Sequence, residues 1–278
     1  MEIHDPVDQK KKLNITVIAD SSAYGQCALR YGELLAVVFK ASLTVVSNFG
    51  FSLEPRNSGK VMAEVMPQLA PDTELIVRTD YFFPERIYRF AEETNTIMFV
   101  IGVDRAGNQG LFNCRRALGF IKPSRIPVMT VGKALPASDA FRNVLLPLDI
   151  ERYAKEKALW AGYFSRFYQS VIHVIYPSYA DAGLQRQVHD NVSFVEKLYA
   201  NLEVLFDSKA VQPQKDMDLF AVEYARNMGA SLTVAIISRY FSLTDLFAGS
   251  RIRKIIGNSY DFPVLCINQR DDLYVLCT

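Results

Sequence analysis

The chain has 278 residues, of which 50% are hydrophobic and 22% are charged. This length favours about two domains, each with enough apolar residues to bury a core. Its 31 Lys and Arg residues balance 30 Asp and Glu residues, so the net charge is +1 and no overall field attracts nucleic acid or anionic lipid. We therefore expect a globular protein that binds neither nucleic acid nor membranes.

Cysteine spacing and hydropathy bear on the compartment. The four cysteines lie far apart in the sequence, which removes the signal for a zinc knuckle or a thiol-exchange motif. The N-terminal region has no apolar stretch that could form the core of a signal peptide. The longest apolar runs, residues 97–103 and 232–237, are too short to cross a membrane. We expect reduced thiols in a cytoplasmic protein.

Short apolar runs alternate with helix-like segments through the first half of the chain. The runs are rich in β-branched residues and lack polar alternation, which is typical of buried strands. Ser21 and Ser22 offer side chains that cap a helix, and Pro84 suits the first turn of another. We predict strands at residues 15–20, 43–47, 74–77, 96–103 and 126–131, with helices after Ser22, around 61–66, after Pro84 and at 111–121.

The second half repeats this order. Residues 133–141 contain Pro136 and carry no periodicity, so they are predicted to link a first domain, residues 1–132, to a second, residues 142–278. Gly229 is placed as the C-terminal cap of a helix. We predict strands at residues 144–149, 171–176, 204–207, 232–238 and 263–268, with helices at 152–167, 184–202, 221–228 and 250–256.

The first strand of each half ends in an aspartate, Asp20 or Asp149, which indicates an internal duplication. Strands that read as solid apolar runs between helices predict parallel sheets covered on both faces. The expected fold is therefore α/β, with two tandem five-stranded doubly wound units. Ligands in such sheets bind beyond the carboxyl ends of strands, so Asp20, Asp149 and the loops after Val103 and Ser238 are the places to search.

Several local patterns carry a family resemblance. They are Asp20-Ser21-Ser22, Ala28-Leu29, residues 96–102, Ile126-Pro127-Val128, Pro147-Leu148-Asp149, residues 246–250 and residues 262–265. Together with the order of elements, these make residues 15–268 resemble the universal stress protein family in its tandem form. The resemblance implies an adenine nucleotide alpha hydrolase-like fold with a pseudo-twofold axis, across which residues 128–131 pair with residues 264–267.

The resemblance also implies a nucleotide site. In nucleotide-binding members, the first-strand aspartate contacts adenine, and a loop with the pattern Gly, two residues, Gly, nine residues, Gly-Ser holds ribose and phosphates. Here Ile236 and Arg239 stand where the two leading glycines are expected, and residues 113–116 replace Gly-Ser in the first half. Neither half therefore holds the complete motif. The candidate binding residues are Asp20, Ser22, Gly102, Asp149, Gly249, Ser250 and Arg251.

Each candidate also has a structural explanation. The two aspartates suit helix caps, Gly249-Ser250 suits the start of a solvated basic helix, and Gly102, Gly107 and Gly110 suit a turn. We find no metal-ligand spacing and no catalytic constellation. The leading hypothesis is a non-enzymatic stress-response protein with degenerate nucleotide sites that acts through a protein partner.

Two alternatives stay open. One is a regulatory switch that binds ATP or AMP at one retained site. The other is an ATP-dependent phosphoryl- or adenylyl-transfer enzyme, which would require a complete phosphate loop and a magnesium carboxylate. The two halves are expected to form an intramolecular pseudo-dimer, with a further homodimer left open.

Overall fold

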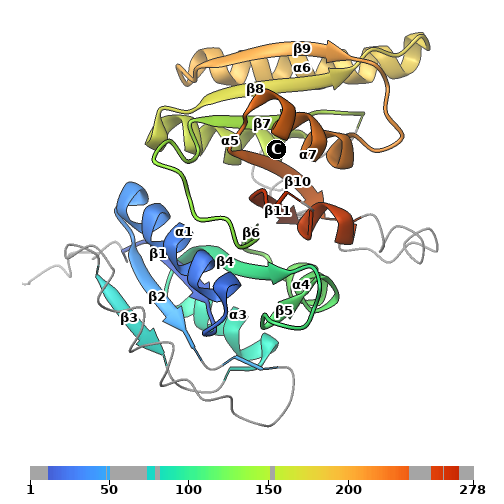
Figure 1. Ribbon diagram of the computed structural model, residues 1–278. Helices are drawn as coiled ribbons and strands as arrows, with labels where there is room; N and C mark the ends of the chain where they lie inside the picture. Colours follow the sequence, from blue (N-terminus) through green and yellow to red (C-terminus); the bar gives the residue numbers. More distant parts are fainter. Residues whose placement is uncertain are drawn as a thin grey trace, which may run out of the picture.

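One continuous 11-stranded sheet passes through both halves of the chain (Figure 1). Its strand order is β3-β2-β1-β4-β6-β11-β10-β7-β8-β9, and the short strand β5 pairs with β4. This is a computed structural model, which describes residues 12–47, 49–50, 74–78, 82–150, 154–237, 252–258 and 260–268.

The labelled elements alternate between strands and helices. The strands are β1 (Asn14–Ile18), β2 (Ser42–Val46), β3 (Leu75–Arg78), β4 (Thr96–Asp104), β5 (Phe112–Asn113), β6 (Val128–Val131), β7 (Asn143–Pro147), β8 (Val171–Pro177), β9 (Phe206–Val211), β10 (Leu232–Ile237) and β11 (Val264–Asn268). The helices are α1 (Ala23–Phe39), α3 (Pro84–Glu93), α4 (Cys114–Ile121), α5 (Ala154–Tyr168), α6 (Ala182–Asn201) and α7 (Met217–Met228), followed by a short helix at residues 252–256.

The two halves share one topology, as the duplication predicted. Each half has its first strand in the middle, its second and third strands on one side, and its fourth and closing strands on the other. Backbone conformations repeat as well. Lys40 after α1 and Gln169 after α5 have φ values of 51° and 54°, and Asn95 and Gly229 have φ values of 53° and 71° after α3 and α7. The predicted pair of doubly wound units is confirmed.

The closing strands join the halves. All pairings inside each half are parallel, whereas β6 and β11 pair antiparallel, with Met129 opposite Leu265. These two residues hold equivalent positions in their own halves, so the pseudo-twofold axis passes through this pair. The predicted seam is confirmed, and it satisfies two sheet edges that would otherwise present unpaired backbone groups.

Helices cover both faces of the sheet, and the core on each face is continuous across the seam. Helices α1, α5 and α6 pack on one face, whereas α3, α4, α7 and residues 252–256 pack on the other. Helices α1 and α5 touch through aromatic contacts such as Phe39 with Phe164 at 6.1 Å between ring centroids. The two halves therefore share one buried interior rather than being tethered by the linker alone.

Three predicted elements differ from the structure. Helix α7, which Asp216 caps, begins at Met217 instead of residue 221. The edge strand β9 spans Phe206–Val211 instead of residues 204–207, because its polar middle pairs with β8 while its side chains stay exposed. Residues 111–113, predicted as the start of a helix, instead lie before it: Phe112 and Asn113 pair with β4, and the Asn113 side chain caps the helix Cys114–Ile121. The helix predicted at 61–66, the end of the strand at 238 and the start of the helix at 250–251 lie outside the described residues.

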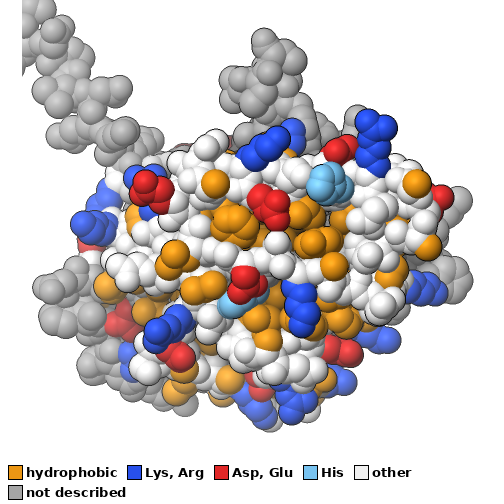
Figure 2. Space-filling view, turned by 90° about the horizontal axis from the view of Figure 1, so that it is seen from above, with side chains coloured by type: hydrophobic (Ala, Val, Ile, Leu, Met, Phe, Trp, Pro, Cys, Tyr) orange, Lys and Arg blue, Asp and Glu red, His pale blue; other side chains and the backbone are white. Residues whose placement is uncertain are grey.

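The surface shows no single-sign patch in the view of Figure 2, where acidic and basic side chains are interspersed with apolar ones. This agrees with the near-zero net charge of the sequence. None of the helices in the described ranges is long and apolar enough to cross a membrane.

Candidate functional site

The order of strands reverses at two places, between β1 and β4 and between β7 and β10. Ligands of doubly wound sheets bind beyond the carboxyl ends of the strands at such switch points. Asp20 and Gly102 lie together at the first switch point, and Asp149 lies at the second. Gly249, Ser250 and Arg251 lie outside the described residues, so their part in a site stays a prediction.

Asp20 and Ser22 build the start of α1. Asp20 Oδ1 accepts hydrogen bonds from the Ser22 amide at 3.3 Å and from its hydroxyl at 2.5 Å. Ser22 Oγ in turn accepts from the amide of Gly25 at 3.1 Å, which is an N-cap bond. A Cβ at Gly25 would lie 2.2 Å from the Asp20 carbonyl oxygen, so only glycine allows this close approach. Ser22 is thus the cap, and Asp20 orients it.

Gly102 is required by packing against α1. A Cβ on Gly102 would lie 2.2 Å from the carbonyl oxygen of Tyr24, which belongs to the first turn of α1. The Tyr24 side chain also lies close to Gly110, 3.4 Å from where a Cβ there would be, and is only 8% exposed. The first turn of α1 therefore sits on the end of β4, and Tyr24 fills space beyond it.

The loop after β4 wraps around a carboxylate of the chain itself. Asp104, the last residue of β4, is fully buried. Its Oδ2 accepts hydrogen bonds from the amides of Asn108, Gln109 and Gly110 at 2.8, 2.7 and 3.1 Å. Its Oδ1 accepts one from Ala106 at 2.9 Å. The loop is an anion cradle, and the anion is covalently part of the protein.

The electrostatics of this cradle favour the charged carboxylate. Burial by itself would raise the pKa of Asp104, but the amides of Gln109, Gly110 and their neighbours donate to the ionised form and hold the pKa at about 2. In phosphate-binding loops, amides of this kind point at the ligand instead. Here they are already bonded to a negative charge, which would repel a phosphate placed nearby.

Asp149 is similarly engaged in the second half. Its Oδ1 accepts hydrogen bonds from the Ile150 amide at 2.8 Å and from the Tyr179 hydroxyl at 2.9 Å. The Asn191 side chain donates to its carbonyl oxygen at 2.7 Å. Burial, followed by the bond to Asp149 and its charge, raises the pKa of Tyr179 to about 12. Asp149 therefore holds neighbouring elements together at the carboxyl end of β7.

A buried ion pair lies at the second switch point. Lys157 of α5 donates to Asp218 of α7 at 2.7 Å and to the Pro147 carbonyl oxygen at 3.1 Å. The side chains of Lys157 and Asp218 are 3% and 11% exposed. Asp218 Oδ2 also accepts a hydrogen bond from the amide of Ile236 at 3.2 Å. The pair thus bridges the ends of β7 and β10.

Ile236 and Gly102 are equivalent, because Met98 pairs with Ile15 and Leu232 pairs with Val144 in matching registers. In each half, then, a carboxylate of the chain bonds backbone amides at or just past this position: Asp104 bonds four, and Asp218 bonds that of Ile236. The pattern of glycines predicted turns or a ligand cradle and missed both carboxylates. The sequence does contain a pattern that could have predicted the role of Asp104: an acidic residue at the end of a strand, directly before a loop with two glycines. The Lys157–Asp218 pair had none, because its members are 61 residues apart.

The described residues offer little for metal chemistry. Within the described ranges, no group of three or more His, Cys, Asp or Glu side chains is arranged to hold a metal ion. His173 instead bonds Asp207 at 2.8 Å and Asn143 at 3.2 Å, at the edge formed by β8 and β9.

Comparisons with known proteins agree with the fold. No family model and no curated protein matches the sequence. Among solved structures, a universal stress protein from Archaeoglobus fulgidus superposes with a TM-score of 0.68 at 13% identity, covering 93% of this chain and 97% of that chain. A functionally unknown protein from Pseudomonas aeruginosa superposes with a TM-score of 0.60 at 13% identity, covering 96% of each chain. The resemblance seen in the sequence is confirmed at the level of the fold: over nearly its whole length, this chain is built like a tandem universal stress protein.

Proposed function

We propose that this chain is a non-enzymatic stress-response protein of the tandem universal stress type, whose nucleotide sites have been converted into internal structural contacts. The observation that carries the proposal is the Asp104 cradle, in which four loop amides bond the chain's own carboxylate. The Lys157–Asp218 pair supports it at the second switch point. With both places engaged, the protein acts through a protein partner rather than through a bound nucleotide.

Division of the chain into domains at residues 133–141 and action in the cytoplasm are parts of the same proposal. The three described cysteines, Cys27, Cys114 and Cys266, form no disulfide, which suits a reducing compartment. No reaction is assigned: among the described residues, Asp20, Asp104, Asp149 and Asp218 at the switch points are already bonded to groups of the chain itself.

Titration of the purified full chain with ATP and with AMP, in the presence of Mg²⁺, tests this proposal. We expect no heat of binding at millimolar nucleotide. Binding at micromolar strength would instead support the regulatory switch, with Gly249, Ser250 and Arg251 on the phosphates and Asp149 or Asp20 on the base. Gly249→Trp in the second half and Asp20→Ala in the first would then show which half holds the nucleotide.

A second arm tests the cradle itself. Asp104→Ala removes the internal anion and leaves the four amides without their acceptor. Inorganic phosphate should then stabilise this variant against urea more than it stabilises the wild type, because the vacated cradle accepts an anion. Asp139→Ala, which removes an exposed carboxylate from the linker, is the matched control and should show no such gain. Equal phosphate effects on all three proteins would contradict the assignment of the cradle.

A further inference from the structure

The pseudo-twofold axis relates two surfaces, the outer side of α1 and the outer side of α5. The linker covers the first of these. Cys27 of α1 donates through Sγ to the carbonyl oxygen of Ala134 at 2.8 Å, and Tyr31 packs on Phe141 at 5.8 Å between ring centroids. The chain that leaves β6 therefore runs along α1 before it enters β7.

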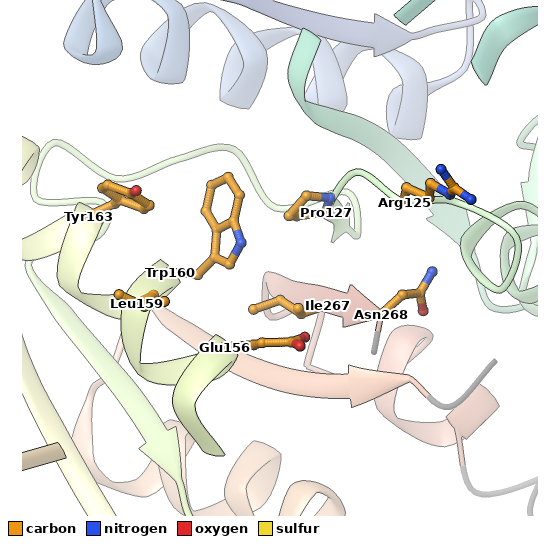
Figure 3. A pocket seen from close by; sticks show the side chains of 8 residues that line it. All are labelled: Arg125, Pro127, Glu156, Leu159, Trp160, Tyr163, Ile267 and Asn268. Carbon is orange, nitrogen blue, oxygen red and sulfur yellow. The ribbon is translucent and has the colours of Figure 1, made fainter. Parts of the chain in front are cut away.

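The second surface is an apolar groove along α5. Leu159, Tyr163 and Phe167 are 41%, 43% and 38% exposed. Figure 3 shows one part of the groove, a pocket of about 200 Å³ that Trp160 and Pro127 line and in which Glu156 extends toward Asn268 at the end of β11. A second pocket of about 380 Å³ shares Trp160 and Tyr163 and continues toward the ends of α1 and α5. Together they form a continuous groove at the seam, which we call the α5 groove.

The two surfaces correspond residue by residue. Lys40 and Gln169 end α1 and α5 in the same conformation, so Cys27 is equivalent to Glu156 and Tyr31 to Trp160. Met129 and Leu265 are equivalent on the closing strands, so the position of Ala134 corresponds to that of Arg270. By this sequence correspondence, Cys27 and Ala134, which touch on α1, match positions 156 and 270 of the second half.

We propose that residues 269–278 occupy the α5 groove, as the linker occupies the outer side of α1. This segment follows directly from Asn268, which lines the groove. Its sequence contains an apolar stretch, Leu273, Tyr274, Val275 and Leu276, which matches the exposed apolar side chains Leu159, Tyr163 and Phe167 of the groove. Covering an apolar surface of this kind is favourable, because it removes apolar side chains from water. The groove is thus an intramolecular docking site.

Trp160 reports on this contact directly, because it is the only tryptophan in the chain and it lines both pockets. In the full chain, its fluorescence should be blue-shifted and poorly quenched by acrylamide. Deleting residues 269–278 should shift the emission to the red and raise the quenching constant about twofold, because the indole becomes exposed to water. A synthetic peptide of residues 269–278 should restore both values when added to the truncated protein.

Point variants within residues 269–278 distinguish the loss of apolar side chains from the loss of the whole segment. Replacing Leu273 and Leu276 together by Asp should act like the truncation, because charges do not fit an apolar groove. Asp271→Asn is the matched control in the same segment and should leave Trp160 unchanged, because the equivalent linker residue, Leu135, is 66% exposed. Far-ultraviolet circular dichroism checks that every variant is folded.

Two results would overturn the proposal. Quenching that is equal in the full-length and truncated proteins, both folded, means that residues 269–278 do not cover Trp160. Protection of Trp160 that disappears on dilution, together with a concentration-dependent size in light scattering, means that a second copy covers the groove instead.

Discussion

Replacing Asp104 by Asn should destabilise the protein, because it removes the charge around which the loop after β4 is folded. The variant keeps the size of the side chain but turns one acceptor oxygen into a donor that faces backbone amides. The fall of the Asp104 pKa from 3.8 to about 2 corresponds to about 2 kcal/mol of folding free energy at neutral pH. Counting the bonds of three amides to Oδ2, at about 1.5 kcal/mol each, gives about 4 to 5 kcal/mol before water solvates the exposed loop. We expect a loss of between about 2 and about 4 kcal/mol.

The pH dependence has a definite sign. A carboxylate with a lowered pKa in the folded state stabilises above its unfolded pKa, and this stability is lost as the pH falls through the folded value. The free energy of unfolding of the wild type should therefore exceed that of Asp104→Asn by the largest amount near pH 7. This difference should be about half as large near pH 3 and mostly gone near pH 2. Urea unfolding followed by circular dichroism at several pH values measures this difference.

The control for this series is Asp139→Asn, because Asp139 is an exposed carboxylate of the linker. This variant should change the free energy of unfolding by less than about 0.5 kcal/mol at every pH. If Asp104→Asn is no less stable than Asp139→Asn near neutral pH, the charge of Asp104 does not hold the loop after β4. The same conclusion follows if the gap between Asp104→Asn and the wild type does not narrow in acid.

Three further variants test individual contacts. Gly102→Ala should cost about 1 to 3 kcal/mol of stability, because its Cβ would lie 2.2 Å from the first turn of α1. Gly119→Ala should instead stabilise by about 0.5 to 1 kcal/mol, because Gly119 is an exposed helix position whose Cβ would meet nothing within 4 Å. Thermal unfolding compares the two variants. Lys157→Met should lower the free energy of unfolding by about 3 to 5 kcal/mol, because it leaves Asp218 buried without its cation. In a double-mutant cycle, adding Asp218→Leu should recover part of that loss. Cys27 should resist thiol reagents in the native state at pH 8 and react after unfolding. The reason is that burial, followed by the charge of Asp261, raises the pKa of its thiol to about 12. Rapid labelling of Cys27 in native buffer would contradict this.

Much of the architecture could be predicted from the sequence because strands buried on both faces read as unbroken apolar runs. Each five-residue strand β1, β2 and β11 is buried along its whole length. The aspartates at the ends of the first strands marked the repeat, and the repeat predicted the seam between β6 and β11. The bounds of β9 were wrong because this strand lies at a sheet edge, where its residues are polar and exposed and so lack the apolar run of a buried strand. Its extent is set by pairing with β8 instead.

The candidate site was less predictable, since its character depends on which partner each polar group finds. Asp20 and Asp149 were placed at the correct corners, but the sequence alone left open whether they bind a ligand or hold the backbone. The amides of residues 106–110 could have faced a phosphate just as well as Asp104, and only the folded loop shows which anion they bond. The pair formed by Lys157 and Asp218 joins two helices that no local pattern connects.

We propose that the chain's own carboxylates take the place of a nucleotide at the two switch points. A crystal structure of the full chain grown with millimolar ATP and Mg²⁺ tests this most directly. We predict the Asp104 carboxylate within the loop of residues 105–110 and Lys157 bonded to Asp218, with no nucleotide density beyond β4 or β10. A phosphate group bonded to those loop amides, with Asp104 turned out of the cradle, would contradict the account.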